Sequence, residues 1–291
     1  MSGPTSRTAA LPHAASVTMA IVGRELRRAW RNPGRVATGA AFPLVFLAVF
    51  GSGLTGVIGP MLRTPSAAPV TYEQYVFPGV IGMAIFFGAM FNAISLVRDR
   101  EFGVLKNVLV APVPRSALAL GKALGSAVVA TAQGTLVLLV APLIGIQPDA
   151  GIIIQLLMIM FLGAFTISAL GVALAARVRS TETFQVIDQF VAFPLIFLST
   201  LFFPLRGLPA WMEVVARINP LSYAVDALRR LTIAATDVPV TVLGRLSDHG
   251  MALSIAGRQT TIVHDLAVVS AFAVAATVAA TALLRVRDRG R

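Results

Sequence analysis

Long apolar stretches with few or no charged side chains are the feature that most constrains this chain. Six occur, at about residues 36–58, 76–97, 119–146, 150–176, 184–205 and 262–284. A helix needs about 20 such residues to cross the hydrocarbon core of a bilayer, and the alternation typical of barrel strands is missing from the sequence. Only 13% of the residues are charged, against about 25% in an average soluble domain. The sequence therefore predicts an all-α integral membrane protein with six transmembrane helices.

The net charge of +11 is distributed in a way that favours a membrane over nucleic acid as the partner. Arginines and lysines lie mainly before the first apolar stretch, between the second and the third, up to Lys122 at the start of the third, and after the fourth and the sixth. By the positive-inside rule, both termini are then cytoplasmic. The segment 206–261 carries six arginines and breaks the pattern, but long segments are translocated largely regardless of charge. Residues 1–16 have no apolar core, which predicts no cleaved signal peptide.

Few residues are suited to catalysis. The chain has no cysteine, which excludes disulfides, thiolate metal sites and cysteine nucleophiles. Two of its three histidines lie outside the apolar stretches and His264 lies at the edge of the last one; they form no metal-binding motif, so no metal site is expected. The stretch LALGKALGS at 118–126 fails the phosphate-loop pattern, because Ala123 follows Gly121-Lys122 and Ser116 stands where the first glycine is required. We expect no catalytic residue and no cofactor in this chain.

The domain boundaries follow from these patterns. Residues 1–17 are expected to be a disordered tail, 18–34 an amphipathic helix on the cytoplasmic face, and 35–288 the transmembrane domain. On the helical wheel of residues 18–31, basic and apolar side chains occupy opposite faces, which favours a position at the membrane surface. This helix is either a simple anchor or a support for a partner protein. Its candidate interfacial residues are Arg24, Arg27, Arg28, Trp30 and Arg31.

The stretch RDREFGVLKNVLVAPVPR at 98–115 concentrates charge between two apolar stretches. Helix is expected from Asp99 to Val110, and Pro112 and Pro114 end it because they remove backbone donors and clash with the preceding turn. Two interpretations stay open: a solvated positive-inside loop, or a helix that docks in the groove of another protein. For the second interpretation, the candidate contact residues are Arg98, Asp99, Arg100, Glu101, Phe102, Gly103, Leu105, Lys106 and Arg115.

Residues 206–235 are too polar to span a bilayer and too apolar for an ordinary loop. Asn219-Pro220 is expected to separate two short helices, and Asp226 and Arg230 stand four residues apart on the second, where they could form an ordinary helix salt bridge. Inside the apolar stretches, polar side chains are few and either contact a substrate or hold helices together. Candidates for the substrate path are Asn92, Gln133, Phe193, Phe197 and Ser199.

Three stretches resemble a known family. In chain order, the three are RELRRAWRNP, RDREFGVLKNVLVAPVPRSALALGK and FLSTLFFPLRGLPAWMEVVARINPLSYAVDALR. They are similar, in the same order, to segments of the permease subunits of type-2 ATP-binding-cassette (ABC) exporters. The closest subgroup is the daunorubicin-resistance-type drug exporters. Val104 departs from the threonine of many relatives, which leaves a polar contact there in doubt.

The resemblance implies a coupling helix at 98–114 that inserts into a separate nucleotide-binding subunit, which binds ATP and Mg. It implies a second permease copy or homologous permease, and a bacterial plasma (inner) membrane location. It also implies a re-entrant segment at 206–235 that gates exit. Its candidate residues are Pro204, Pro209, Trp211, Asn219, Pro220, Tyr223, Asp226, Arg229 and Arg230.

The function that the resemblance implies is ATP-driven export of a hydrophobic or amphipathic compound. Export of a lipid-linked polysaccharide is the alternative within the same family. A secondary carrier and a membrane-embedded assembly protein are the alternatives from other classes. No acidic residue lies in the middle of an apolar stretch, and because proton-coupled carriers usually keep one there, the sequence favours coupling to ATP.

Overall fold

The computed structural model describes residues 10–54, 56, 70–103, 114–202, 209–236, 253–255 and 258–286. Within these residues the chain forms nine α-helices, two short helical turns and one small antiparallel hairpin. The helices are α1 (Ala10–Trp30), α2 (Pro33–Phe46), α4 (Tyr72–Glu101), α6 (Arg115–Leu138), α7 (Ala150–Arg177), α8 (Thr181–Phe197), α9 (Ala210–Ile218), α10 (Pro220–Ala234) and α12 (Ile262–Val286). The turns are a π-helix at Leu47–Gly51 and a 3₁₀ helix at Ala141–Ile144, and the strands are β1 (Ser254–Ile255) and β2 (Arg258–Gln259).

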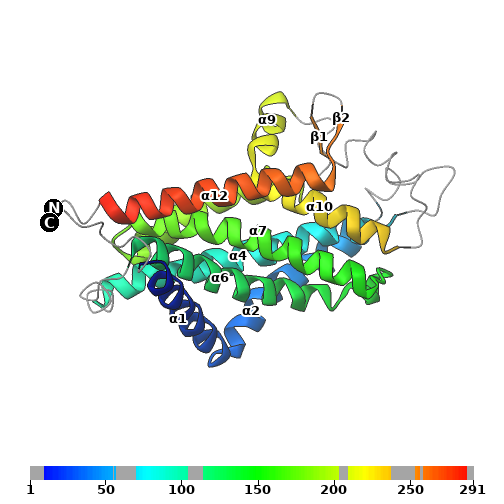
Figure 1. Cartoon of the computed structure of the whole chain (residues 1–291). Helices are drawn as coiled ribbons and strands as arrows, with labels where there is room; N and C mark the ends of the chain where they lie inside the picture. The colour runs from blue at the N-terminus through cyan, green and yellow to red at the C-terminus, as the bar shows by residue number, and fades with distance from the viewer. Residues whose placement is uncertain are drawn as a thin grey trace, which may run out of the picture.

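Helix α4 is the centre of an all-helical bundle (Figure 1). It begins with a capping box, in which the Thr71 side chain accepts a hydrogen bond from Gln74 N and the Gln74 side chain accepts one from Thr71 N. Most of its apolar residues are buried against α2, α6, α7, α8 and α10. The start of α1 and the end of α12 lie at the same end of this bundle (Figure 1).

Four helical stretches among the described residues are long and apolar enough to cross a membrane. They are Pro33–Leu54, Tyr72–Glu101, Ala150–Arg177 and Ile262–Arg285. The other two expected spans are not among them. Helix α6 is less apolar because it contains the buried Lys122, and α8 is too short, with 17 residues; it ends at Phe197, three residues after Pro194. The structure thus confirms an all-helical membrane protein, and the six-span topology stays a prediction.

Two expected boundaries differ from the observed ones. Helix α1 already begins at Ala10, inside the segment expected to be a disordered tail. Residues 98–101 are the last turn of α4 and not the start of a separate helix. Helix α4 ends at Glu101, Phe102 is its C-cap, and Gly103 follows with φ +72°, the left-handed conformation that terminates helices. Residues 104–113, with the candidates Leu105 and Lys106, lie outside the described part of the chain.

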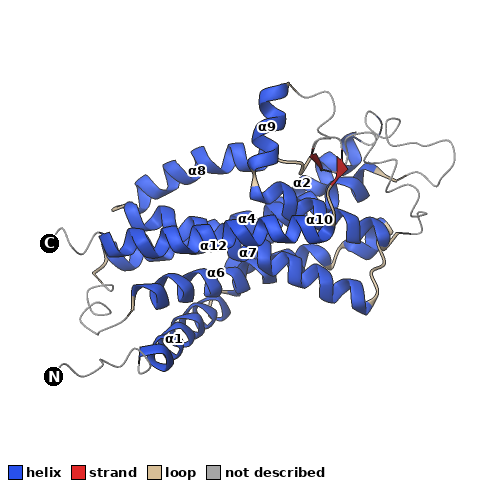
Figure 2. Ribbon diagram, turned by 45° about the horizontal axis from the view of Figure 1, so that its top comes forward, coloured by secondary structure: helices blue, strands red, loops and turns tan. Residues whose placement is uncertain are grey.

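The region after α8 contains the two short helices that were expected, α9 and α10, separated at Asn219-Pro220. Asn219 caps α10 by accepting a hydrogen bond from Leu221 N (3.0 Å), and its amide donates to Leu195 O of α8 (2.7 Å). Helix α9 stands out from the bundle (Figures 1 and 2), whereas α10 is buried between α4, α7 and α12. Re-entry of this region into the membrane stays a prediction.

Candidate functional site

A large apolar side chain, that of Phe102, is exposed to solvent at the end of α4. Phe102 is 73% exposed, directly after the last helical residue. Three of the charged residues before it, Asp99, Arg100 and Glu101, instead bind groups elsewhere in the chain. Arg100 donates hydrogen bonds to the carbonyl oxygens of Ala175 (3.1 Å) and Val178 (2.7 Å) at the end of α7, where the helix dipole favours a cation.

Glu101 joins α4 to the start of α8. Its Oε2 accepts hydrogen bonds from the hydroxyl (2.5 Å) and the backbone N–H (3.3 Å) of Thr181, the first residue of α8. A carboxylate at a helix N-terminus is favoured by the unpaired N–H groups and the helix dipole. Together, Arg100 and Glu101 attach the end of α4 to the α7–α8 junction.

A buried ion cluster lies just inside the same end of the bundle. Lys122 of α6 is 1% exposed and donates to Glu25 Oε1 (2.7 Å), Asp99 Oδ2 (2.6 Å) and Ser95 Oγ (3.0 Å). These three acceptors match the three protons of an ammonium group. Arg24 donates to the same Asp99 oxygen (2.8 Å), so two cations and two carboxylates balance. We call Arg24, Glu25, Asp99 and Lys122 the ion cluster; it links α1, α4 and α6.

Sequence reasoning missed most of this cluster. Lys122 was assigned to the positive-inside pattern, Asp99 to a docking surface, and Glu25 was not considered. One signal was available: Glu25 is the first acidic residue of the chain and lies alone among the arginines of its helix. Lys122, likewise, lies seven residues inside an apolar helix that begins at Arg115.

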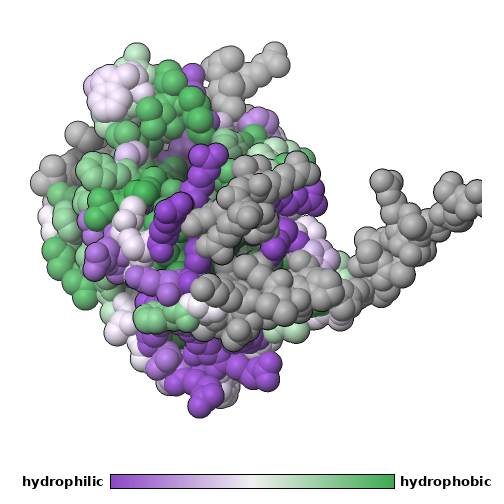
Figure 3. Space-filling model, turned by 90° about the vertical axis from the view of Figure 1, so that its left-hand side faces the viewer, coloured by the Kyte–Doolittle hydropathy of each residue, from purple (hydrophilic) through white to green (hydrophobic). Residues whose placement is uncertain are grey.

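Helix α1 has three kinds of surface. Its inner side packs on α6, where Gly121 and Gly125 allow close approach: a Cβ on Gly121 would lie 2.8 Å from Ile21 Cβ, and one on Gly125 would lie 2.9 Å from Glu25 Cβ. Its outer sides carry the arginines and an apolar strip that contains Trp30, which is 88% exposed. Figure 3 shows hydrophilic surface gathered at the lower edge of this end of the molecule, beside hydrophobic flanks.

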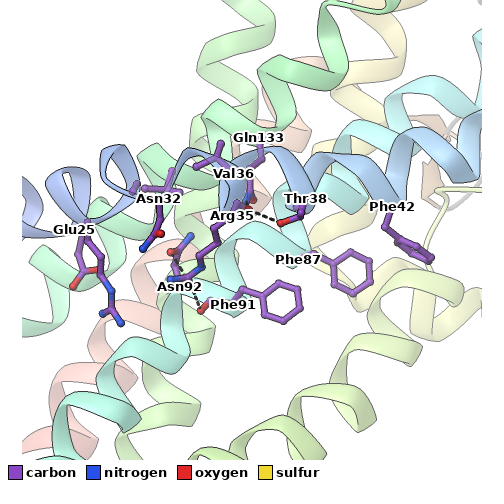
Figure 4. A pocket seen from close by; sticks show the side chains of 14 residues that line it. Glu25, Asn32, Arg35, Val36, Thr38, Phe42, Phe87, Phe91, Asn92 and Gln133 are labelled. Carbon is purple, nitrogen blue, oxygen red and sulfur yellow. Dashed lines mark hydrogen bonds between the residues drawn. The ribbon is translucent and has the colours of Figure 1, made fainter.

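A cavity of about 420 Å³ lies between α1, α2, α4 and α6 (Figure 4). Two expected substrate-path residues, Asn92 and Gln133, line it. Gln133 is wedged between Gly39 of α2 and Gly88 of α4, and a Cβ at either glycine would collide with its amide. Asn92 donates to Gly88 O (2.7 Å) and also receives a long hydrogen bond from Arg35 (3.4 Å). Both amides therefore hold helices together and face the cavity.

The other expected path residues lie elsewhere, at α8. Phe193 and Phe197 stack on each other with centroids 5.5 Å apart and are largely exposed, while Ser199 donates to Ile196 O (2.6 Å). A second, apolar cavity of about 790 Å³ is lined by residues of α4, α7, α8 and α12. Its lining includes Phe86, Met90, Phe190 and Phe272.

The candidate gate residues form two buried networks. Asp226 is fully buried and accepts hydrogen bonds from Arg230 Nε (2.9 Å), Leu253 N (3.1 Å) and Thr260 Oγ1 (3.3 Å). The expected Asp226–Arg230 helix salt bridge thus exists and also holds the segment around the β1–β2 hairpin against α10. Arg230 further approaches the buried Asp265 of α12 (3.8 Å).

Arg229 joins α10 to α4 and to the end of α8. Its guanidinium donates to Thr200 O (2.5 Å) and Tyr75 O (3.4 Å), and lies 4.4 Å from the centroid of the Tyr75 ring. Tyr223 donates to Arg217 O (2.6 Å), and Trp211 of α9 is exposed. Pro209 precedes α9 and Pro220 begins α10; Pro204 lies outside the described residues.

The chain matches the family described as "ABC-2 type transporter" over residues 16–232, which covers the ion cluster, the whole cavity of Figure 4, most of the apolar cavity and all but the last two residues of α10. The chain belongs to the ABC-2 type transporter family. The ABC-2 membrane permease domain lacks the ATPase site, and membership implies a nucleotide-binding partner and dimerisation.

Curated relatives agree with this membership. The transport permease ycf38 of Porphyra purpurea is 28% identical over 72% of each chain. The multidrug ABC transporter permease YbhR of Escherichia coli K12 is 30% identical over 55% of this chain and 44% of its own. The daunorubicin resistance permease DrrB1 of Streptomyces coeruleorubidus is 24% identical over 75% of each. The permease is therefore a multi-pass membrane protein.

Proposed function

We propose that this permease forms the transmembrane path of an ATP-driven exporter and that the end of α4 receives the stroke of a separate ATPase subunit. One observation carries this proposal: Phe102 is exposed at a point where the residues beside it are bonded to α1, α6, α7 and α8. A push on Phe102 would therefore reach four helices through short polar contacts. A solvated loop requires no such connections.

The proposed cargo is a hydrophobic or amphipathic compound, as for drug exporters of the daunorubicin-resistance type. The apolar cavity beside α8 and the mixed cavity beside α2 both support such a cargo. Two relatives carry the words multidrug and daunorubicin resistance in their names. Export of a lipid-linked polysaccharide remains the alternative within the family, and an ATP-independent carrier the alternative outside it.

The proposed assembly contains two permease copies, six spans each, with cytoplasmic termini in a bacterial plasma membrane. The surface of α8 is the proposed contact with the second copy. Helix α8 packs mainly on α4, and the large rings of Phe190, Phe193 and Phe197 are exposed on its outer side, where a second permease would cover them. We further propose that α9 and α10, as a re-entrant segment, lie near the exit of the path.

The coupling proposal predicts that Phe102→Ala abolishes transport while the permease still folds. Loss of a central interface anchor costs about 2–4 kcal/mol of binding, or roughly 30-fold to 1,000-fold in affinity for the ATPase subunit. The measurements are co-purification of the ATPase subunit and transport in vesicles. Glu101→Gln should weaken both less, because Glu101 also serves the chain internally through Thr181.

The matched control for the coupling test is Thr181→Val, which removes the hydroxyl that donates to Glu101, keeps the backbone N–H donor and leaves Phe102 untouched. It should lower thermal stability slightly and keep the ATPase subunit bound. Normal transport by Phe102→Ala, with normal ATPase activity, would mean that 98–115 is only a positive-inside loop.

The six-span topology can be tested directly because the chain has no native cysteine. Ser116→Cys and Gly290→Cys should be shielded from an impermeant thiol reagent in intact cells, whereas Thr64→Cys and Asp248→Cys should react. The reason is that the first pair is predicted to be cytoplasmic and the second pair external. Labelling of Gly290→Cys from outside would require an odd number of spans.

A further inference from the structure

The cavity of Figure 4 continues into a basic hollow on α1. The cavity, of about 420 Å³, and the hollow, of about 490 Å³, are both lined by Arg28 and Asn32. The hollow is otherwise lined by Arg24, Arg27 and Arg31. Polar groups thus gather at the end of the cavity formed by α1 and the start of α2.

The charge at this end is positive. Glu25 also lines the cavity, but its carboxylate is bound to Lys122 in the ion cluster. Arg35 donates to Phe91 O (2.8 Å), which carries no formal charge. Among the described residues Arg28 has neither an ion pair nor a hydrogen bond through its side chain. A buried or half-buried cation is stabilised by an anion, so the site is electrostatically incomplete.

The opposite end of the cavity is aromatic. In Figure 4 the rings of Phe42, Phe87 and Phe91 lie in a row that leads away from Arg35 and Asn92. The Phe42 and Phe87 rings meet edge to face at 5.8 Å, and those of Phe87 and Phe91 lie 6.4 Å apart. Phe42 and Phe91 remain more than 40% exposed, so an apolar ligand could still remove surface from water.

Gln133 adds a specific polar group to the cavity wall. Its side chain is 4% exposed, and its Oε1 has no hydrogen-bond partner among the described residues. A buried carbonyl oxygen without a donor costs free energy. The cavity volume falls in the range of about 300–1,000 Å³ that is typical of small-molecule sites.

We propose that this cavity binds an anionic amphiphile, with its carboxylate or phosphate head at Arg28 and its apolar part along Phe42, Phe87 and Phe91. The basic hollow of Arg24, Arg27 and Arg31 gives the head its entry from the membrane surface. This site stands whether or not the coupling proposal is right, because it needs only the permease itself. The amphiphile comes either from the bilayer or from the cargo, and both sources share this chemistry.

The test uses two diazirine-bearing probes of the same chain length, a fatty acid and the corresponding fatty alcohol, on the purified permease in neutral detergent. The fatty acid should label peptides of α2 and α4 about tenfold more than the alcohol. This ratio is the difference in affinity expected from one charge-assisted hydrogen bond. Arg28→Gln should remove this preference and Arg28→Lys should keep most of it. The control Arg285→Gln changes a basic residue of α12 that lines neither hollow, and should leave labelling unchanged.

A second arm separates the two sources in nanodiscs. Photoactivatable phosphatidylglycerol that labels α2 and α4 more than phosphatidylcholine does identifies a lipid from the bilayer. Labelling by the fatty acid without labelling by phosphatidylglycerol identifies a single-chain ligand. Either of these two results supports the proposal that the cavity binds an anionic amphiphile. Equal labelling by acid and alcohol, labelling confined to other helices, or no effect of Arg28→Gln would overturn the proposal.

Discussion

Replacing Lys122 with methionine is expected to destabilise the folded permease by about 3–5 kcal/mol, the usual effect of removing one partner of a buried ion pair. Methionine fills a similar volume but leaves the carboxylates of Glu25 and Asp99 without the ammonium that they share. Arg24 cannot replace it fully, because Arg24 is 40% exposed and lies 3.6 Å from Glu25. The measurement is the free energy of unfolding in mixed micelles, followed by circular dichroism as the fraction of SDS rises.

Two variants control the Lys122 experiment. Arg217→Met breaks the exposed pair with Glu213 on α9, where both side chains are more than a third exposed, and should cost at most about 1 kcal/mol. Combining Lys122→Met with Glu25→Gln and Asp99→Asn should recover much of the lost stability, because no uncompensated charge stays buried. If Lys122→Met alone matches the wild type, the ion cluster does not hold α1, α4 and α6 together.

Replacing Gly79 with alanine is expected to destabilise the permease by about 1–3 kcal/mol through overpacking. A Cβ on Gly79 of α4 would collide with the carbonyl oxygen of Leu201 and lie 2.9 Å from its carbonyl carbon. These are backbone atoms that cannot rotate away. Arg229 also fixes the neighbouring Thr200 carbonyl, so relief would require loss of that bond. The same unfolding measurement applies.

Gly53→Ala is the matched control for Gly79→Ala, because no atom of the described residues, apart from the adjoining backbone, lies within 4 Å of a Cβ at Gly53. It should leave stability unchanged or raise it by up to about 1 kcal/mol, since alanine favours helix over glycine. Equal stability of the two alanine variants would show that the close approach of α4 to Leu201 does not restrict this position.

The sequence alone predicts the class of this protein and the positions of most helices. Apolar length and low charge indicate an all-helical membrane protein, because a bilayer leaves the backbone few alternatives. Local chemistry also marks the breaks: Asn219-Pro220 separates α9 from α10, as expected. The resemblance of three charged or aromatic stretches indicated the family, which the match over residues 16–232 confirms.

Local sequence signals predict the end of a helix less reliably where contacts with other helices decide it. Charged residues at 98–101 suggested a new helix, but they continue α4 because Arg100 and Glu101 find partners on α7 and α8. The partners of Arg100 and Glu101 are 75 to 80 positions away along the chain, so no local pattern could identify them. The start of α1 also differs from the expected one, because the helix extends back to Ala10.

Only the tertiary structure decided which polar residues act together. Asn92 and Gln133 meet in one cavity, whereas Phe193, Phe197 and Ser199, which belonged to the same predicted path, lie at α8. Lys122 looked like one more positive-inside residue, yet it is buried between Glu25 and Asp99. Composition and periodicity determine that helices form and which are apolar. The three-dimensional contacts between distant helices determine which buried charge has a partner, because that depends on distances of about 3 Å that sequence spacing does not encode.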